Sequence, residues 1–123
     1  MPQPPLVIVV DDDPGMSRAM GRMIETAGMT PVLYRSAEAM LDGGRHDAAC
    51  VVIDVHLPGM DGFQLYERLA ARGDRAPVVF VSASEDAEQD ARARAGHSVT
   101  FLAKPFSGLA LLERLRSLLD EAA

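Results

Sequence analysis

The sequence predicts a single α/β domain in which a parallel sheet is covered by helices on both faces. Short apolar runs alternate with segments of helical periodicity along all 123 residues. The runs are rich in Val and Ile, as is typical of strands that are buried on both faces. Parallel strands need a crossover between them, and the helical segments supply it. The length is that of one ordinary domain, and no linker or repeat divides residues 1–123.

The first strand and the first helix have well-defined limits in the sequence. Residues 6–10 are a continuous apolar run. Asp13 is the expected N-cap of the next helix, and Pro14 lies in its first turn. Gly28 is expected to end this helix. Its apolar residues recur with helical spacing and form one stripe: Met16, Met20, Met23, Ile24 and Ala27.

Four more apolar runs predict the remaining strands, at residues 31–34, 49–53, 77–81 and 99–102. The first of these contains Pro31, which has no backbone N–H, so it is expected at an edge of the sheet. The next contains Cys50, the single cysteine of the chain. Without a second ligand at a suitable spacing, Cys50 predicts a buried free thiol and a cytosolic location.

Four more helices are expected around these strands. Ser36 is the predicted cap of a short helix that extends through Leu41. Asp61 is the predicted cap of the next helix, whose apolar residues are Phe63, Leu65, Leu69 and Ala70. Residues 85–95 favour a helix whose apolar side chains are all alanine. Such a helix packs shallowly and can shift at low cost, although a plain surface helix has the same composition. The closing helix is expected to bury a stripe formed by Leu109, Leu112, Leu115 and Leu119.

Polar residues follow four of the five predicted strands, at the edge where a parallel sheet binds its ligands. They are Asp11 and Asp12 after the first strand, Asp54 after the third, Ser82 after the fourth and Lys104 after the fifth. Each alone has an ordinary explanation, such as a turn carboxylate, a helix cap or a solvated charge. Their convergence at one edge predicts a functional site.

The three carboxylates of this set predict a divalent cation. Crowded carboxylates repel one another, which raises at least one pKa unless a cation lies among them. Oxygen ligands favour Mg2+, or alternatively Mn2+, over zinc. Three aspartates, one lysine and one Mg2+ carry no net charge together, and a phosphoryl group would then add about one negative charge. A lysine and a hydroxyl are suitable donors to such a group.

The chain resembles the receiver domains of bacterial two-component response regulators. The resemblance depends on four segments: Val10-Asp11-Asp12-Asp13-Pro14, residues 54–62 (Asp-Val-His-Leu-Pro-Gly-Met-Asp-Gly), Ser82-Ala83, and Lys104-Pro105-Phe106. Their order and spacing match over essentially the whole chain. The implied fold is flavodoxin-like, a doubly wound sheet of strand order 2-1-3-4-5. The motifs are similar to those of nitrogen-fixation and nitrate-response regulators, whose receivers are joined to helix-turn-helix domains.

The resemblance implies a role for each of these positions. Asp54 would accept a phosphoryl group from a phosphohistidine of a partner histidine kinase or phosphotransfer protein. Asp12, Asp54 and the backbone carbonyl of His56 would bind Mg2+ directly, and Asp11 would act largely through water. Lys104 would pair with a phosphoryl oxygen, and the Lys104-Pro105 peptide bond would be cis. The protein would be a switch and no conventional turnover enzyme.

The resemblance also implies how the signal leaves the site. Ser82, followed by Ala83, matches the family's switch hydroxyl, and Phe101 matches its switch aromatic. Movement of Ser82 toward the phosphoryl group would leave space into which Phe101 turns. The surface of the fourth helix and fifth strand, the expected dimer or partner face, would then change. His56 and Ser84 flank the path of a hydrolytic water and are expected to tune the phosphorylated lifetime, unless His56 simply faces solvent.

Other functions fit the sequence less well. The net charge of −6 opposes non-specific binding of nucleic acid by this chain. No apolar run approaches the roughly 20 residues that span a membrane. Residues 1–5 lack the basic region with which a secretory signal begins, so no such signal is expected. A phosphatase of the haloacid dehalogenase type would need a second Asp at position 56, and a flavodoxin would need Ser, Thr or Gly at 11–13. His46 and His97 are expected in loops, with no metal-site spacing between them. Two questions stay open. One is whether the chain is a receiver-shaped module that no longer accepts phosphate. The other is whether it is a single-domain regulator or part of a longer protein with an output domain.

Overall fold

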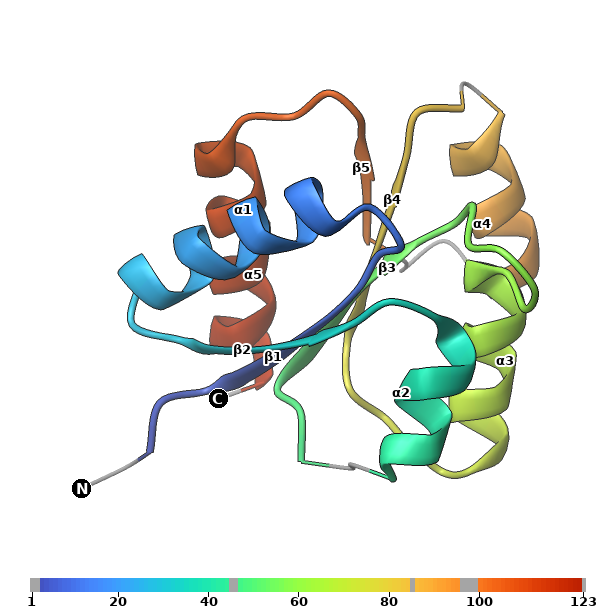
Figure 1. Ribbon diagram of the computed structural model, residues 1–123, viewed down its shortest axis with the longest axis horizontal. Coiled ribbons are helices and arrows are strands. Elements are labelled where there is room, and N and C mark those ends of the chain that lie inside the picture. Colours follow the sequence, from blue (N-terminus) through green and yellow to red (C-terminus); the bar gives the residue numbers. More distant parts are fainter. Residues whose placement is uncertain (1–2, 45–46, 85, 96–99, 123) are drawn as a thin grey trace.

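The computed structural model describes residues 3–44, 47–84, 86–95 and 100–122, in which strands and helices alternate (Figure 1). Within these ranges the strands are β1 (Leu6–Val10), β2 (Thr30–Tyr34), β3 (Cys50–Asp54), β4 (Val78–Ser82) and β5 (Thr100–Ala103). The helices are α1 (Pro14–Thr26), α2 (Ala37–Gly43), α3 (Gly62–Ala71), α4 (Ala87–Ala95) and α5 (Gly108–Ala122). All strand pairs are parallel, in the order β2-β1-β3-β4-β5, which confirms the predicted doubly wound sheet.

The sheet separates two apolar layers. Helices α1 and α5 cover one face, and α2, α3 and α4 cover the other (Figure 1). Successive residues of β1 point to opposite faces, so Val7 and Val9 pack toward α1 and α5, while Ile8 and Val10 pack toward the other layer. Both faces are therefore buried, which explains why the strand sequences are continuously apolar.

The predicted caps hold the helices in place. The Asp13 carboxylate accepts hydrogen bonds from the amides of Gly15 and Met16 at 2.9 and 3.3 Å. Ser36 Oγ accepts from Ala39 N at 3.0 Å and caps α2. Asp61 caps α3 in a capping box. Its carboxylate accepts a hydrogen bond from Gln64 N, and the Gln64 side-chain oxygen accepts one from Asp61 N. Gly28 follows α1 with a φ of 86°, as expected for a residue that ends a helix.

The apolar stripe predicted for the closing helix is partly wrong. Leu109 is 64% exposed, whereas Leu111 and Leu115 are fully buried against the sheet. Because α5 begins at Gly108, Leu109 lies in its first turn on the side away from the core. Leu112 and Leu119 are only partly buried.

The structure differs from the sequence predictions in smaller ways at the boundaries of some elements and at single residues. Ala70 is exposed rather than packed, and α2 ends at Gly43 rather than at Leu41. Asp54 and Ser82 are the last residues of β3 and β4, not the residues after them. Several expectations fall outside the described residues: the loop positions His46 and His97, the helix start at Glu85 and the strand start at Val99. No helix of the described part of the chain has the length and apolar character needed to cross a membrane.

Candidate functional site

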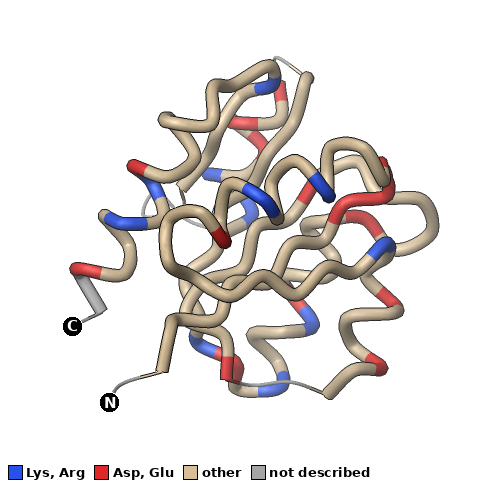
Figure 2. The backbone as a smooth tube through the Cα atoms, turned by 60° about the vertical axis from the view of Figure 1, so that its left-hand side comes forward, with Lys and Arg blue, Asp and Glu red and all other residues tan. Residues whose placement is uncertain are grey.

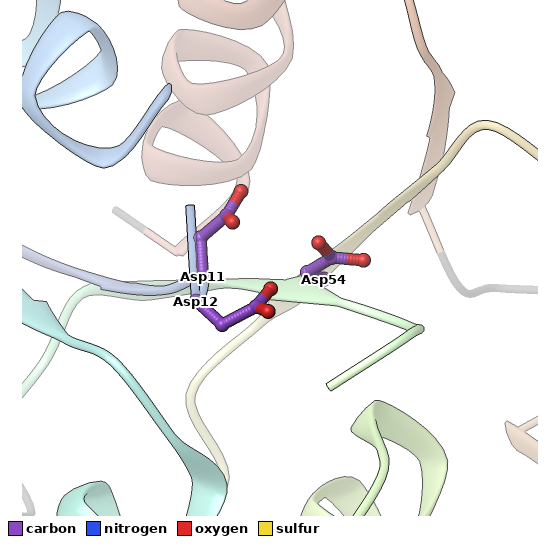
Figure 3. Close-up of side chains that lie close together, drawn as sticks. All are labelled: Asp11, Asp12 and Asp54. Carbon is purple, nitrogen blue, oxygen red and sulfur yellow. The ribbon is translucent and has the colours of Figure 1, made fainter. Parts of the chain in front are cut away.

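Three carboxylates meet at the carboxyl-terminal edge of the sheet, as Figure 3 shows. Asp11 and Asp12 follow β1, and Asp54 ends the neighbouring strand β3. Each offers an oxygen, and these three oxygens lie within 4.8 Å of one another. Asp11 and Asp54 are buried, whereas Asp12 is exposed. The predicted carboxylate cluster is therefore present, with a solvent-facing side at Asp12.

The position of Asp54 is fixed by the sheet and by the turn that follows. Its backbone pairs with Val81 of β4, and Val55 N donates to Val81 O at 3.0 Å. One carboxylate oxygen of Asp54, Oδ1, accepts from His56 N at 2.9 Å. The side chain is thus held at the edge of the sheet, with its second oxygen directed to other partners.

Asp11 is the most deeply buried carboxylate of the cluster, with 1% of its surface exposed. Burial raises the pKa of Asp11, and the nearby Asp54 charge acts in the same direction. The hydrogen bond from Asp13 N, 2.9 Å long, and the Lys104 charge oppose this rise in pKa without cancelling it. A buried carboxylate whose pKa is raised is one that an additional cation would stabilise.

Lys104 joins this cluster from the end of β5. Its Nζ lies 3.1 Å from Asp54 Oδ2 and 3.4 Å from Asp11 Oδ2. Partial burial by itself lowers the pKa of Lys104, but the hydrogen bond with Asp54 and the charges of both aspartates raise it overall. Lys104 N donates to Ser82 O at 2.8 Å, and the Lys104-Pro105 peptide bond is cis, as expected. Because its pKa is raised, the Lys104 ammonium stays charged at neutral pH beside Asp54, the predicted phosphoryl acceptor.

Ser82 lies at the end of β4, between the strands that carry Asp54 and Lys104. Its side chain is 1% exposed, and its Oγ accepts from Ser84 N at 3.0 Å, which leaves the hydroxyl hydrogen free to be donated. Ala83 is exposed next to it. Phe101 lies further back on β5 and is 9% exposed, packed in the layer that contains α3 and α4.

A groove of about 530 Å3 opens next to the carboxylates, between the segment after β3 and helix α4. His56 and Ser84 both line it, together with Asp12. The two residues that were predicted to act as a pair thus border the same groove. His56 is exposed, which is also what the alternative, a solvent-facing histidine, would give.

Two contacts near the site were not predicted from the sequence. Arg94 of α4 lies over the Phe63 ring at 4.8 Å and forms an ion pair with Glu67. Glu38 of α2 accepts a hydrogen bond from Met60 N, in the segment between Asp54 and α3, at 3.2 Å. Both contacts join residues more than 20 positions apart, and no local sequence pattern marks them. Elsewhere, acidic and basic residues are interspersed along the backbone (Figure 2).

Comparison with known proteins identifies the family to which this chain belongs. The family model described as response regulator receiver domain matches residues 7–116. Nodulation protein W of Bradyrhizobium diazoefficiens is 35% identical over 88% of this chain and 48% of its own length. Transcriptional regulatory protein FixJ of Azorhizobium caulinodans is 32% identical over 100% of this chain and 59% of its own. The chain thus spans about half the length of these curated relatives.

The fold is also that of solved receiver structures. The receiver domain of the Francisella response regulator 1452 superposes with a TM-score of 0.86 at 26% sequence identity. The match covers 97% of this chain and 99% of that structure.

Proposed function

We propose a phosphorylation switch for this chain, which belongs to the family of response regulator receiver domains. In this proposal Asp54 accepts a phosphoryl group in the presence of Mg2+, and the surface near α4 and β5 responds. The observation that carries it is the contact of Lys104 Nζ with Asp54 Oδ2, 3.1 Å apart, beside two further aspartates. The proposed nucleophile, its neighbouring cation and the proposed metal ligands thus share one edge of the sheet.

The carboxylates suit a small divalent cation. The donor set is all oxygen, its atoms lie within 4.8 Å of one another, and Asp12 leaves one side open to water. We propose that Asp12, Asp54 and the backbone carbonyl of His56 hold Mg2+ or Mn2+ directly, and that Asp11 contributes through water. When bound, the ion would neutralise charge on the incoming phosphoryl group. Asp11 would then keep its negative charge more readily, since a second cation lies close by.

The proposed phosphoryl transfer depends on how the reacting groups are positioned and on how their charges are neutralised, and not on proton transfer. An ionised Asp54 oxygen would attack phosphorus, forming a P–O bond while the P–N bond to a kinase imidazole breaks. The imidazole leaves with the electron pair of that bond. Because the nucleophile is a carboxylate rather than a hydroxyl, no general base is required. Lys104 would move its hydrogen bond from the carboxylate to a phosphoryl oxygen.

Ser82 and Phe101 would pass the change to the surface. The Ser82 hydroxyl is the donor we assign to the phosphoryl group, and Ala83 would offer its backbone N–H beside it. Phe101 is already buried in this structure. Phosphorylation would therefore raise the population of this inward ring position rather than create it. The altered α4 and β5 surface is the proposed face for a homodimer or another partner.

His56 and Ser84 are proposed to set how long the phosphoryl group lasts. Both line the groove that opens beside Asp12 and Val55, next to Asp54 in the chain. Replacement of both residues is expected to change the dephosphorylation rate, because it alters how water is held in line with the P–O bond. The rate is measured by following loss of phosphoprotein after the phosphodonor is removed. An unchanged rate in the double variant would remove this role.

The proposed switch needs a phosphodonor and an output that lie outside this chain. We propose a sensor histidine kinase or phosphotransfer protein as the donor, and signalling rather than turnover as the activity. The relative FixJ is a transcriptional regulatory protein, so control of transcription is a proposed output for the whole protein. Cys50 is a buried free cysteine, and burial raises its pKa to about 12, so its thiol is unreactive. We propose a cytoplasmic location, where free thiols are the norm.

One experiment tests the switch directly. The chain is incubated with acetyl phosphate and MgCl2, and the mass of one added phosphoryl group is sought. The same protein is treated with beryllium fluoride and Mg2+ and followed by NMR, because the chain has no Trp for fluorescence. We expect modification and shifts in the wild type and neither in Asp54→Asn. An unmodified wild type, or equal modification of Asp54→Asn, would refute the proposal.

A further inference from the structure

The segment between Asp54 and α3 is fastened from outside by helix α2. Oε2 of Glu38 accepts a hydrogen bond from Met60 N at 3.2 Å, across 22 residues of sequence. Glu38 lies in the first turn of α2, which is capped by Ser36 and packed through buried Ala37 and Met40. The acceptor therefore projects from a part of the helix that is itself fixed.

Gly59 provides the space into which this carboxylate fits. A Cβ added at Gly59 would lie only 2.6 Å from Glu38 Oε2, and the residue has a φ of 73°. Any other residue would be strained at this φ and would push the carboxylate away from Met60 N. Gly59 and Glu38 thus form a matched pair, in which the glycine permits the close approach and the carboxylate uses it.

This contact completes the restraint of the segment that contains His56. At its start, His56 N donates to Asp54 Oδ1 at 2.9 Å, and Gly62 N donates back to Val55 O at 2.9 Å. Leu57 is 6% exposed and anchors the middle of the segment in the core. The Glu38 bond fastens the far end at Met60. The backbone around His56 is therefore held on both sides.

We infer that Glu38 is a positioning residue for the metal site, acting through the backbone of residues 56–60. The inference depends on the proposed function, since it assigns the His56 carbonyl to the ion. A ligand that is held in place before the ion arrives loses less conformational freedom on binding, and affinity rises accordingly. Glu38 itself touches no ion and no substrate in this scheme.

Three substitutions at Glu38 separate hydrogen bonding from charge. Glu38→Ala removes both the acceptor and the charge. Glu38→Gln keeps an acceptor of the same length and loses the charge, whereas Glu38→Asp keeps the charge on a shorter side chain. Asp42→Ala is the matched control, because it removes an exposed carboxylate from the same helix. Thermal unfolding of each variant shows whether the fold is retained, as expected for exposed positions.

Two measurements are made on each protein. Mg2+ affinity is taken from an NMR titration of amides around Asp54, and hydrogen exchange of the Met60 amide is measured without metal. We expect Glu38→Ala and Glu38→Asp to weaken Mg2+ binding about fivefold, the effect of one ordinary hydrogen bond. Met60 exchange should become faster in the same two variants. Glu38→Gln and Asp42→Ala should stay within about twofold of wild type in affinity.

The outcomes distinguish this inference from the proposed function. A wild type that shows no Mg2+ response refutes the metal site, and the role of Glu38 with it. A wild type that responds, with Glu38→Ala binding Mg2+ equally well, refutes the role of Glu38 alone. Equal weakening in Glu38→Ala and Glu38→Gln, with Glu38→Asp normal, would show a charge effect and also overturn positioning through the hydrogen bond.

Discussion

Helices α3 and α4 are neighbours on the same face of the sheet, yet they are held there by different means (Figure 1). Helix α3 buries Phe63, Leu65 and Leu69, and its Phe63 ring packs edge-on against Phe80 with centroids 5.1 Å apart. The described part of α4 buries only alanines, at positions 87 and 91. Burial of large side chains contributes about 1.5–3 kcal/mol each, and a methyl group much less. The site is therefore bordered by one firmly packed helix and one lightly packed helix.

The connections between these helices follow the same pattern. A capping box fixes the start of α3, whereas α4 is tied to α3 by the exposed side chain of Arg94. Exposed ion pairs contribute little, because water screens them. A change at Asp54 should accordingly move α4 while α3 stays in place. The lightly packed helix α4 is therefore the part of this layer that can transmit a signal at low cost in free energy.

The largest expected effect concerns this difference in response. Treatment with beryllium fluoride and Mg2+ should shift the NMR amide signals of α4 and β5 strongly and those of α3 weakly, since α4 has less packing to resist movement. Asp54→Asn should abolish the response in both helices. Shifts in α3 as large as those in α4 would contradict the comparison.

Shortening a core side chain of α3 should have the next largest effect. Leu65 is fully buried, so Leu65→Ala leaves a cavity in the layer under α3. We expect the free energy of unfolding to fall by about 3 kcal/mol. Urea denaturation measures this value, and Arg68→Ala on the exposed face of α3 serves as the control. A loss below about 1 kcal/mol would show that α3 is not firmly packed.

The matching substitution in α4 should have a smaller effect. Ala91→Gly removes one buried methyl group and lowers helix propensity, for an expected loss of about 1–2 kcal/mol. Hydrogen exchange of α4 amides should accelerate more than global unfolding predicts, because this helix opens by itself. Exchange that matches global unfolding would indicate that α4 is as firmly held as α3.

The edge of the sheet, where Asp11 lies between the two helix layers, should make the stability of the metal-free protein depend on pH. Burial, mainly, raises the pKa of Asp11 above 3.8, so the folded state holds its proton more tightly than the unfolded state does. Metal-free stability should therefore fall as the pH rises from about 4 through the folded pKa. Asp11→Asn should remove this loss and raise the Tm at pH 7 by a few degrees.

Two checks accompany this measurement. Mg2+ should reduce the difference in Tm between wild type and Asp11→Asn at pH 7, because the ion would stabilise the ionised carboxylate of the wild type. Lys104 has the opposite charge and a raised pKa, so its stabilising contribution is complete at neutral pH and is lost only as the pH rises above 10.5. A metal-free Asp11→Asn protein that is less stable than wild type at pH 7 would contradict the reasoning.

Much of the architecture is encoded locally and could be predicted. Continuous apolar runs gave the strands, because a strand buried on both faces needs apolar residues at every position. Asp13, Ser36 and Asp61 marked helix starts, because a cap acts on amides only two or three residues away. The edge position of Asp54 and Lys104 followed from strand order, since parallel strands end on the same side.

The tertiary structure alone decided the features that depend on distant partners. Residues 108–122 contain enough leucines for more than one stripe, and the position of the sheet selected Leu111 and Leu115 over Leu109. The contacts of Glu38 with Met60 and of Arg94 with Glu67 leave no local pattern. Their existence depends on how closely separate helices approach, because a hydrogen bond forms only within about 3.5 Å and sequence spacing does not fix that distance.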